Sequence, residues 1–427
     1  MSRRRPTDAR ATEGSPALSR RALLTGTAGA LGGAMLAGLP GVLDGQETAP
    51  ARPIVPDDAT KLQGAATSPL GERSPFVTAS RAPYGETVGS SYTPLQDLTG
   101  VVTPSDLHFE RHHAGIPALD PERHTLTIHG LVERPLTFSV DDLKRFPQTV
   151  RTYFIECSGN GRAAYREPKP EMTAQKVSGM LSTSEWTGVP LATLFREVGA
   201  KPEAKWFLAE GGDACLMTRS VPMAKAWDDA MVVWAQNGEP LRPAQGYPIR
   251  LLLPGWEGNI NVKWLRRLEL GAAPWMTRWE TAKYTDPRPD HTADMFTFAQ
   301  QAKSIITSPS QPGRIASQGW HAVHGLAWTG RGRITKVEVS VDGGRRWHQA
   351  ELLGEVRAKA PVRFQHMWEW RGEAATLLSR ATDETGEVQP TRTALIERRG
   401  IGTDYHFNQI VGWQVARDGA VTFHGES

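Results

Sequence analysis

The sequence has 427 residues, which is long for a single hydrophobic core and predicts two or three domains. Hydrophobic residues make up 39% and charged residues 22%, so the composition excludes a largely disordered chain. The 49 Lys and Arg nearly balance the 46 Asp and Glu, so the basic excess of a nucleic-acid-binding protein is missing and no nucleic-acid partner is expected.

Residues 1–46 have the features of an export signal. They hold six arginines against three acidic residues, which accounts for the whole net charge of +3. Ser19-Arg20-Arg21-Ala22-Leu23-Leu24 precedes a weakly apolar, Gly- and Ala-rich run, as is typical of a twin-arginine signal. A transmembrane anchor is the alternative, but the run is short and interrupted by threonines. We expect a folded, cofactor-containing protein exported to the periplasm, with no membrane span in the mature chain.

The rest of the chain divides into three segments by composition. Residues 47–100 are rich in Pro, Gly, Ser and Thr and predict an extended arm or linker. Residues 101–290 mix strand and short-helix patterns, and residues 291–427 show strand patterns almost alone. The absence of G-x-G-x-x-G and P-loop motifs argues against a dinucleotide or nucleoside triphosphate, and the absence of C-x-x-C-H argues against a haem in this chain.

The elements expected in residues 101–290 are short and mixed, which predicts an α+β domain. Ser139 is the expected cap of a helix that ends before Pro147. A second helix is predicted at 191–198. Strands are predicted at residues 124–128, 231–234, 249–253 and 262–270.

Alternating strand patterns dominate the C-terminal segment. They are expected at residues 334–341, 362–370 and 378–386, with a turn at Asp342-Gly343-Gly344. Short strands separated by turns predict an all-β sandwich of immunoglobulin type. An inter-sheet disulfide is excluded because no cysteine follows Cys215.

Cys157 is the most informative position for function. It ends an apolar, strand-forming run, Tyr153-Phe-Ile-Glu-Cys157, and is followed by Ser-Gly-Asn-Gly-Arg162. Three roles are open: a buried free thiol, a disulfide with Cys215, or a metal or cofactor thiolate. The polar loop and Arg162, which can lower the thiol pKa, favour the third role. A single cysteine cannot hold zinc or an iron–sulfur cluster, so a metal with other ligands from an organic cofactor fits better.

Five ordered segments of the chain resemble the sulfite oxidase family of molybdenum enzymes. The resemblance covers roughly residues 100–420, and the order and spacing of the segments make it specific. The segments are Phe109-Glu-Arg-His-His113, the cysteine loop 157–162, Trp186-Thr-Gly-Val-Pro-Leu191, residues 237–255 with Gly246-Tyr-Pro-Ile-Arg250, and Asn261-Val-Lys-Trp-Leu265.

The resemblance implies roles for particular residues. Cys157 is the implied thiolate ligand of molybdenum, and 101–290 and 291–427 are the implied molybdopterin-binding and dimerisation domains. Arg111 and Arg162 are expected to face an anionic substrate, and Tyr284 corresponds to the active-site tyrosine. A surface charge or a packing role remains the alternative for each. The residues expected to bind molybdopterin are Arg111, His113, Cys157, Asp213, Gln245, Arg250 and Lys263.

Two positions depart from the animal and plant pattern. Ala244-Gln245-Gly246 stands where those members have Asp-His-Gly, and Gly161 stands where a second arginine is expected beside Arg162. Both changes resemble the bacterial sulfane dehydrogenases of the family. This resemblance implies oxidation of a sulfane sulfur on a carrier protein, with electrons passed to a cytochrome c partner and a homodimer formed through the C-terminal domain.

Three alternatives stay open. Free sulfite is the alternative substrate. A non-catalytic secreted binding protein would have no metal and a Cys157–Cys215 disulfide. A methionine sulfoxide reductase of the same family is disfavoured because those relatives usually lack a domain like residues 313–427.

Overall fold

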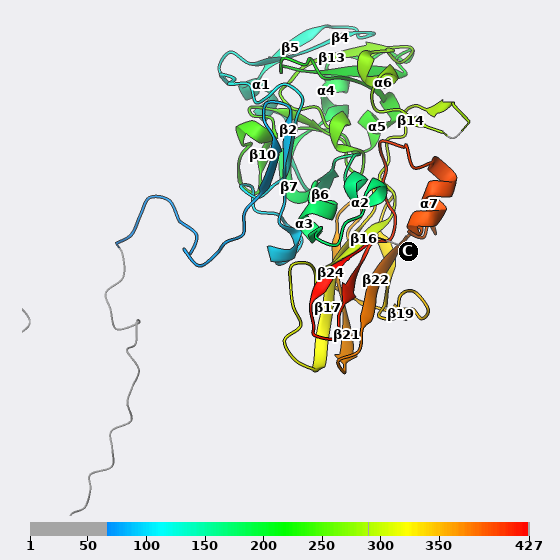
Figure 1. Cartoon of the computed structure of the whole chain (residues 1–427). Helices are drawn as coiled ribbons and strands as arrows, with labels where there is room; N and C mark the ends of the chain where they lie inside the picture. The colour runs from blue at the N-terminus through cyan, green and yellow to red at the C-terminus, as the bar shows by residue number, and fades with distance from the viewer. Residues whose placement is uncertain (1–65, 289, 426–427) are drawn as a thin grey trace, which may run out of the picture. The chain divides into compact units, whose positions relative to one another are not determined.

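A computed structural model describes residues 66–288 and 290–425. Within these ranges, residues 73–288 and 290–425 belong to one compact unit (Figure 1). The signal predicted at residues 1–46 lies outside the described residues. Residues 82–97 of the predicted arm form two strands and a short 3-10 turn, η2 (Leu95–Asp97), so this end of the arm is part of the folded unit.

Three sheets build the first part of this unit. The smallest has the order β1-β2-β3 and is antiparallel, with strands Ala82–Gly85, Gly89–Tyr92 and Glu110–His112. The second has the order β11-β10-β7-β6, with β12 also paired to β10: Glu239–Pro240, Met231–Gln236, Leu181–Pro190, Thr149–Glu156 and Arg250–Leu252. The third has the order β5-β4-β13-β8-β9: Leu136–Ser139, Thr125–Gly130, Leu265–Gly271, Trp206–Gly211 and Thr218–Pro222.

Short helices connect and cover these sheets. They are α1 (Val140–Lys144), α2 (Arg162–Arg166), α3 (Ala174–Ser178), α4 (Leu191–Glu197), α5 (Met223–Asp228) and α6 (Arg278–Thr281), with 3-10 turns η3 (Pro243–Gln245) and η4 (Gly258–Ile260). Ser139 caps α1 as expected, and its hydroxyl accepts from the Asp142 N–H. The predicted strand at 262–270 begins only at Leu265, because Trp264 has a positive φ of 54°.

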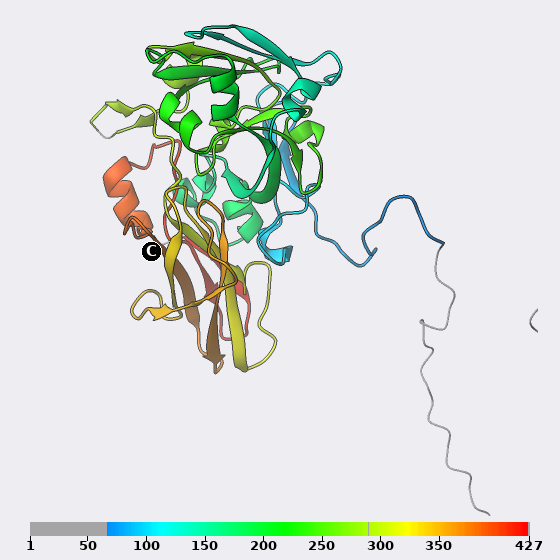
Figure 2. The same cartoon turned by 180° about the vertical axis from the view of Figure 1, so that it is seen from behind.

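The C-terminal part is a sandwich of two antiparallel sheets, seen from both sides in Figures 1 and 2. A four-stranded sheet has the order β16-β17-β21-β20: Lys303–Ser308, Gly319–Trp328, Val362–Trp370 and Glu351–Leu353. A five-stranded sheet has the order β19-β18-β22-β23-β24: His348–Gln349, Ile334–Ser340, Ala375–Asp383, Gly412–Val415 and Val421–His424. The hairpin β14–β15 (Asp286–Pro287, Ala293–Asp294) precedes the sandwich, and α7 (Arg392–Arg399) lies between β22 and β23 in the chain.

The core of the sandwich continues into the first part of the unit. Phe154 of β6 and Leu181 of β7 belong to the same buried cluster as Trp328, Phe364 and Trp413 of the sandwich. The strand that leads to Cys157 is therefore held partly by the C-terminal domain. The predicted α+β class with an all-β immunoglobulin-like domain is confirmed.

Candidate functional site

Cys157 follows directly on the last residue of β6. Its N–H donates to the Met180 carbonyl at 3.0 Å, and its carbonyl accepts from the Asn160 N–H at 2.9 Å. The Asn160 side chain is buried and donates to Glu156 at 2.9 Å and to the Ser178 carbonyl at 3.0 Å. Gly161 turns the chain into α2 with a φ of 99°, which a residue with a Cβ adopts only at a cost. The cysteine loop is thus fixed by its own polar residues.

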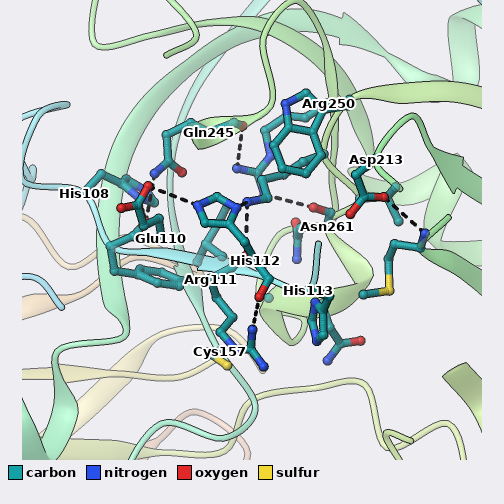
Figure 3. Close-up of a pocket in the computed structure, with 18 of the residues that line it drawn as sticks. His108, Glu110, Arg111, His112, His113, Cys157, Asp213, Gln245, Arg250 and Asn261 are labelled. Atoms are coloured by element: carbon teal, nitrogen blue, oxygen red, sulfur yellow. Dashed lines mark hydrogen bonds and ion pairs between the residues drawn. The ribbon is translucent and has the colours of Figure 1, made fainter. Parts of the chain in front are cut away.

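A cavity of about 70 Å³ opens at Cys157 (Figure 3). Nine residues were predicted for the site, and only Arg162 is missing from the wall of this cavity. The other eight are Arg111, His113, Cys157, Asp213, Gln245, Arg250, Lys263 and Tyr284.

Two buried cations form one end of the cavity. Arg250 donates to the carbonyls of Gln245 at 3.0 Å and Asn261 at 2.9 Å, while its buried Nε has no partner in the described part of the chain. Lys263 Nζ contacts the carbonyls of Arg111 at 3.1 Å and Ala244 at 3.0 Å, and His112 Nδ1 at 2.9 Å. Burial lowers the pKa of both groups, and in Lys263 the charge of Arg250 lowers it further.

Arg111, at the middle of β3, reaches toward the Cys157 end of the cavity (Figure 3). Its Nη1 donates to the carbonyl of the neighbouring His112. Within residues 66–288 and 290–425, none of Arg111, Arg250 and Lys263 forms an ion pair, although all three line the same cavity. Unpaired cations in a shared cavity create a site for an anion.

Tyr284 and His113 share a hydrogen bond of 2.9 Å between the phenol oxygen and Nε2. Burial raises the pKa of Tyr284 well above its ordinary value, so the phenol stays protonated. Burial and then the charge of Arg111 lower the pKa of His113 to about 3, so its imidazole is neutral at physiological pH. The guanidinium of Arg219 lies over the Tyr284 ring, 4.9 Å from its centre, and this cation–π contact helps to hold the ring in place.

The side chains of Asp213 and Gln245 form hydrogen bonds to neighbouring segments of the chain. Asp213 accepts a hydrogen bond from Cys215 Sγ at 2.8 Å, and burial together with this carboxylate raises the pKa of Cys215 to about 12. Gln245 donates to the Phe109 carbonyl at 2.8 Å and so positions the chain that leads to Arg111. Both cysteines are free thiols, so the disulfide required by the non-catalytic alternative is not formed.

Arg162 lies at the mouth of the site. A Cβ placed on Gly159 would be 3.3 Å from Arg162 Nη2 and 4.0 Å from Cys157 Sγ, so both groups face the same small space. Arg162 lines a second, open groove of about 990 Å³, and Arg111 lines both the groove and the cavity. Burial raises the pKa of the Cys157 thiol and outweighs the hydrogen bond with Gly159 and the charges of Arg111 and Arg162, which lower it.

The sequence did not single out several residues of the cavity wall. His108, Glu110 and His112 line it, and burial lowers the pKa of both histidines. Glu110 and His112 lie in the segment 109–113 that carries the family resemblance, but the sequence assigned them no role. In the described ranges no set of three His, Cys, Asp or Glu side chains is arranged to bind a metal ion. No helix there has the length and apolar character needed to cross a membrane.

Comparison with known proteins assigns a class to each part of the chain. Residues 113–279 match a family model described as an oxidoreductase molybdopterin binding domain. Residues 295–412 match a model described as a Mo-co oxidoreductase dimerisation domain. The cavity and these two domains define the class of molybdopterin-binding oxidoreductases.

Whole-chain similarities narrow this class. A chain of the crystal structure of the sulfane dehydrogenase SoxCD from Paracoccus pantotrophus is 43% identical, with a TM-score of 0.82 over 86% of this chain and 97% of that one. Mitochondrial sulfite oxidase from Mus musculus is 30% identical over 70% of this chain, which spans 59% of that relative's length. An NADH nitrate reductase from Ulva prolifera is 30% identical over 68% of this chain and 38% of its own. The chain belongs to the sulfite oxidase family of molybdenum enzymes.

Proposed function

We propose that this protein oxidises a sulfane sulfur carried on a partner protein and passes the electrons to a cytochrome c. One observation carries the proposal: a single protein thiol, Cys157, shares a cavity with three cations, Arg111, Arg250 and Lys263, that form no ion pair with any described residue. The 43% identity to a chain of the sulfane dehydrogenase SoxCD supports the choice of sulfane sulfur and of a cytochrome partner.

The residues present fit a molybdopterin cofactor. Its phosphate is an anion, and the buried Nε of Arg250 is an unused donor in the cavity wall. Arg250 and Lys263 are the residues that would hold this phosphate, while Cys157 would bind molybdenum through its thiolate. His113, Asp213 and Gln245 border the same space and would contact the pterin with polar atoms.

The chain's own residues bind and orient the substrate. Molybdenum held by molybdopterin supplies oxygen-atom transfer to sulfur and takes up the electrons that each oxidation releases. Arg111 and Arg162 hold the anionic sulfur group near Cys157. The Tyr284 phenol donates a hydrogen bond toward the cavity or to His113, and neutral His113 adds no further positive charge.

The open groove favours a protein-borne substrate. It runs between β1–β2 and α2–α3 and reaches Arg111 and Arg162. Its volume of about 990 Å³ leaves room for a chain segment as well as for a small anion. Basic side chains outnumber acidic ones along it, with Arg111, Arg162, Arg166, Lys169 and Lys176 against Glu167 and Glu171.

Free sulfite remains the second candidate substrate. The 30% identity to sulfite oxidase and the pair Arg111 and Arg162, which both line the groove, favour it, because paired arginines suit a small oxyanion. The match of residues 295–412 to a dimerisation domain supports a homodimer. The twin-arginine sequence at Arg20-Arg21 supports export to the periplasm in the folded state.

Cytochrome c reduction separates the two substrates. The purified protein is assayed with free sulfite and, separately, with thiosulfate plus a sulfur-carrier protein. Activity that requires the carrier supports the proposal, and activity with free sulfite alone contradicts it. Metal analysis is expected to give about one molybdenum per chain, because a single Cys157 is present in each cavity.

Two cysteine variants test the role of Cys157. Cys157→Ser is expected to abolish turnover while the dimer, measured by size-exclusion chromatography with light scattering, stays intact. Cys215→Ser is the matched control, since a serine hydroxyl can still donate to Asp213. Full activity of Cys157→Ser would remove the central claim.

A further inference from the structure

A carboxylate from the C-terminal domain lies against the arginines at the mouth of the site. Arg162 Nε and Nη2 donate to the carbonyl of Asp404 at 3.2 and 2.7 Å, and its Nη2 lies 3.8 Å from the Asp404 carboxylate. The same carboxylate accepts from Arg166 Nη2 at 2.8 Å. Asp404 is 46% exposed, so its charge acts on the open groove as well as on the arginines.

The segment that carries Asp404 is anchored to the cysteine loop. The His406 N–H donates to the Ser158 carbonyl at 2.8 Å, and the Phe407 ring packs against Tyr165 with centroids 5.0 Å apart. Tyr405 follows Asp404 in the chain, and its ring lies 5.0 Å from that of Tyr284 and 5.7 Å from the Arg162 guanidinium. The backbone therefore fixes the position of the carboxylate relative to Cys157.

Asp404 reduces the positive charge that a substrate meets at the mouth. Arg162 and Arg166 line the open groove. One carboxylate, 3.8 Å from the first and 2.8 Å from the second, leaves a net charge of about +1 where two guanidinium groups lie. A small dianion loses more attraction than a singly charged group, because the interaction scales with the product of the charges. A sulfur group on a carrier protein also gains binding from its polypeptide, which a free anion does not.

We propose that Asp404 is a specificity-determining residue that disfavours free dianions such as sulfite and so favours a singly charged, carrier-bound sulfur group. The inference rests on the proposed function and names the means by which the same site selects its substrate. Asp404 acts through Arg162 and Arg166, so it is a positioning and charge-setting residue and not a catalytic one.

The variant Asp404→Asn removes the charge and keeps both the carbonyl that binds Arg162 and an oxygen for Arg166. It is expected to lower the KM for free sulfite about three- to tenfold, with a smaller change for the carrier-bound substrate. The Kd of sulfate, measured by isothermal titration calorimetry on the holoenzyme, is expected to fall by a similar factor. Raising the ionic strength should shrink this difference, since the groups are partly exposed.

Two matched variants separate charge from structure. Asp404→Glu keeps the charge and is expected to bind sulfate as the unchanged protein does. Asp418→Asn removes a 61% exposed carboxylate paired with Arg314 and is expected to leave both KM values unchanged. Equal sulfate Kd values for Asp404→Asn and the unchanged protein would overturn the inference. An equal loss of both activities, together with a lower melting temperature, would also overturn it by showing a structural role.

Failure of the proposed function gives a different result. If the unchanged protein oxidises neither substrate, the proposed function is wrong, and the sulfate titration still decides the effect of Asp404 on anion binding. If it oxidises carrier-bound sulfur and Asp404→Asn leaves the preference over sulfite unaltered, only the inference about Asp404 is wrong.

Discussion

Lys303, at the start of β16, donates a 2.9 Å hydrogen bond to Glu156, the residue before Cys157, and both side chains are almost completely buried. The Glu156 carboxylate also accepts from Trp328 Nε1 at 2.7 Å and from Asn160 Nδ2 at 2.9 Å. Lys303 reaches the Asn160 carbonyl at 3.1 Å as well. A residue of the sandwich domain thus fixes the strand end that presents the thiol.

Removal of Lys303 is expected to destabilise the protein strongly. Lys303→Met leaves the Glu156 carboxylate buried without a cation, which should lower the free energy of unfolding by about 3–5 kcal/mol. The double variant Lys303→Met/Glu156→Gln should recover part of this loss. Urea unfolding measures the stability of the single and the double variant. Arg371→Met, which breaks an exposed ion pair with Glu369, is the control and should lower the free energy of unfolding by less than about 1 kcal/mol. Equal losses at the two sites would contradict the role of the buried pair.

The sequence predicted those features of the site that lie in short, contiguous segments. These features are the strand before Cys157, the loop 157–162 and the cations Arg250 and Lys263. Each could be predicted from neighbouring residues, because a strand pattern or a motif spans only a few positions. Their convergence in one cavity agrees with the ordered segments of the family.

The contacts that the sequence did not predict join distant segments. Arg162 and Asp404 are 242 residues apart, and neither has a local pattern that indicates the other. The three-stranded sheet β1-β2-β3 was also missed, because all its strands are short and the first two are rich in Gly, Ser and Pro. Arg162 was expected to be able to lower the pKa of Cys157, but the direction of the net shift depends on burial, which only the folded chain reveals.

Arg250 provides a test of cofactor binding that does not depend on turnover. Arg250→Met removes a buried cation whose Nε has no partner among the described residues. The affinity for the pterin phosphate should fall about 10- to 100-fold, because a charge-assisted hydrogen bond contributes about 1.5–3 kcal/mol. Molybdenum and pterin content of the purified protein measure this loss. Arg266→Met, at a partly exposed arginine that pairs with Glu210, is the control and should keep full content.

Gly258 packs closely against the backbone of Glu156 and Cys157, and substituting it tests whether this contact holds the thiol in place. A Cβ at this position would lie 3.0 Å from the Glu156 carbonyl oxygen and 3.3 Å from both Cα and N of Cys157. These are backbone atoms, so Gly258→Ala must displace the cysteine loop. Turnover should fall at least about tenfold, since reacting groups must be held in register. Gly71→Ala meets no atom within 4 Å and should have no effect, while full activity of Gly258→Ala would show that the loop can adjust.

His406 should make the protein sensitive to acid. The ring is buried, its Nε2 lies 3.2 Å from Thr297 Oγ1, and its Nδ1 has no partner among residues 66–288 and 290–425. Burial, followed by the charges of Arg399 and Arg331, lowers the pKa of His406 to about 3. The carboxylates of Glu257 and Asp286 lie 3.7 and 3.8 Å from His406 Nε2, and their negative charges would raise its pKa. Burial raises the pKa values of both carboxyl groups, so they are weaker counter-charges for His406.

The direction of the effect follows from the proton balance. Below the ordinary histidine pKa of about 6.5 the unfolded chain takes up a proton, whereas folded His406 does not until about pH 3. Stability is therefore lost as the pH falls through this window, by up to about 1.4 kcal/mol per pH unit. His406→Gln should show a shallower decline between pH 6.5 and 4.5 in urea unfolding, even if it is less stable at pH 7. Exposed His348→Gln is the control, and identical slopes for His406→Gln and the unchanged protein would refute the effect.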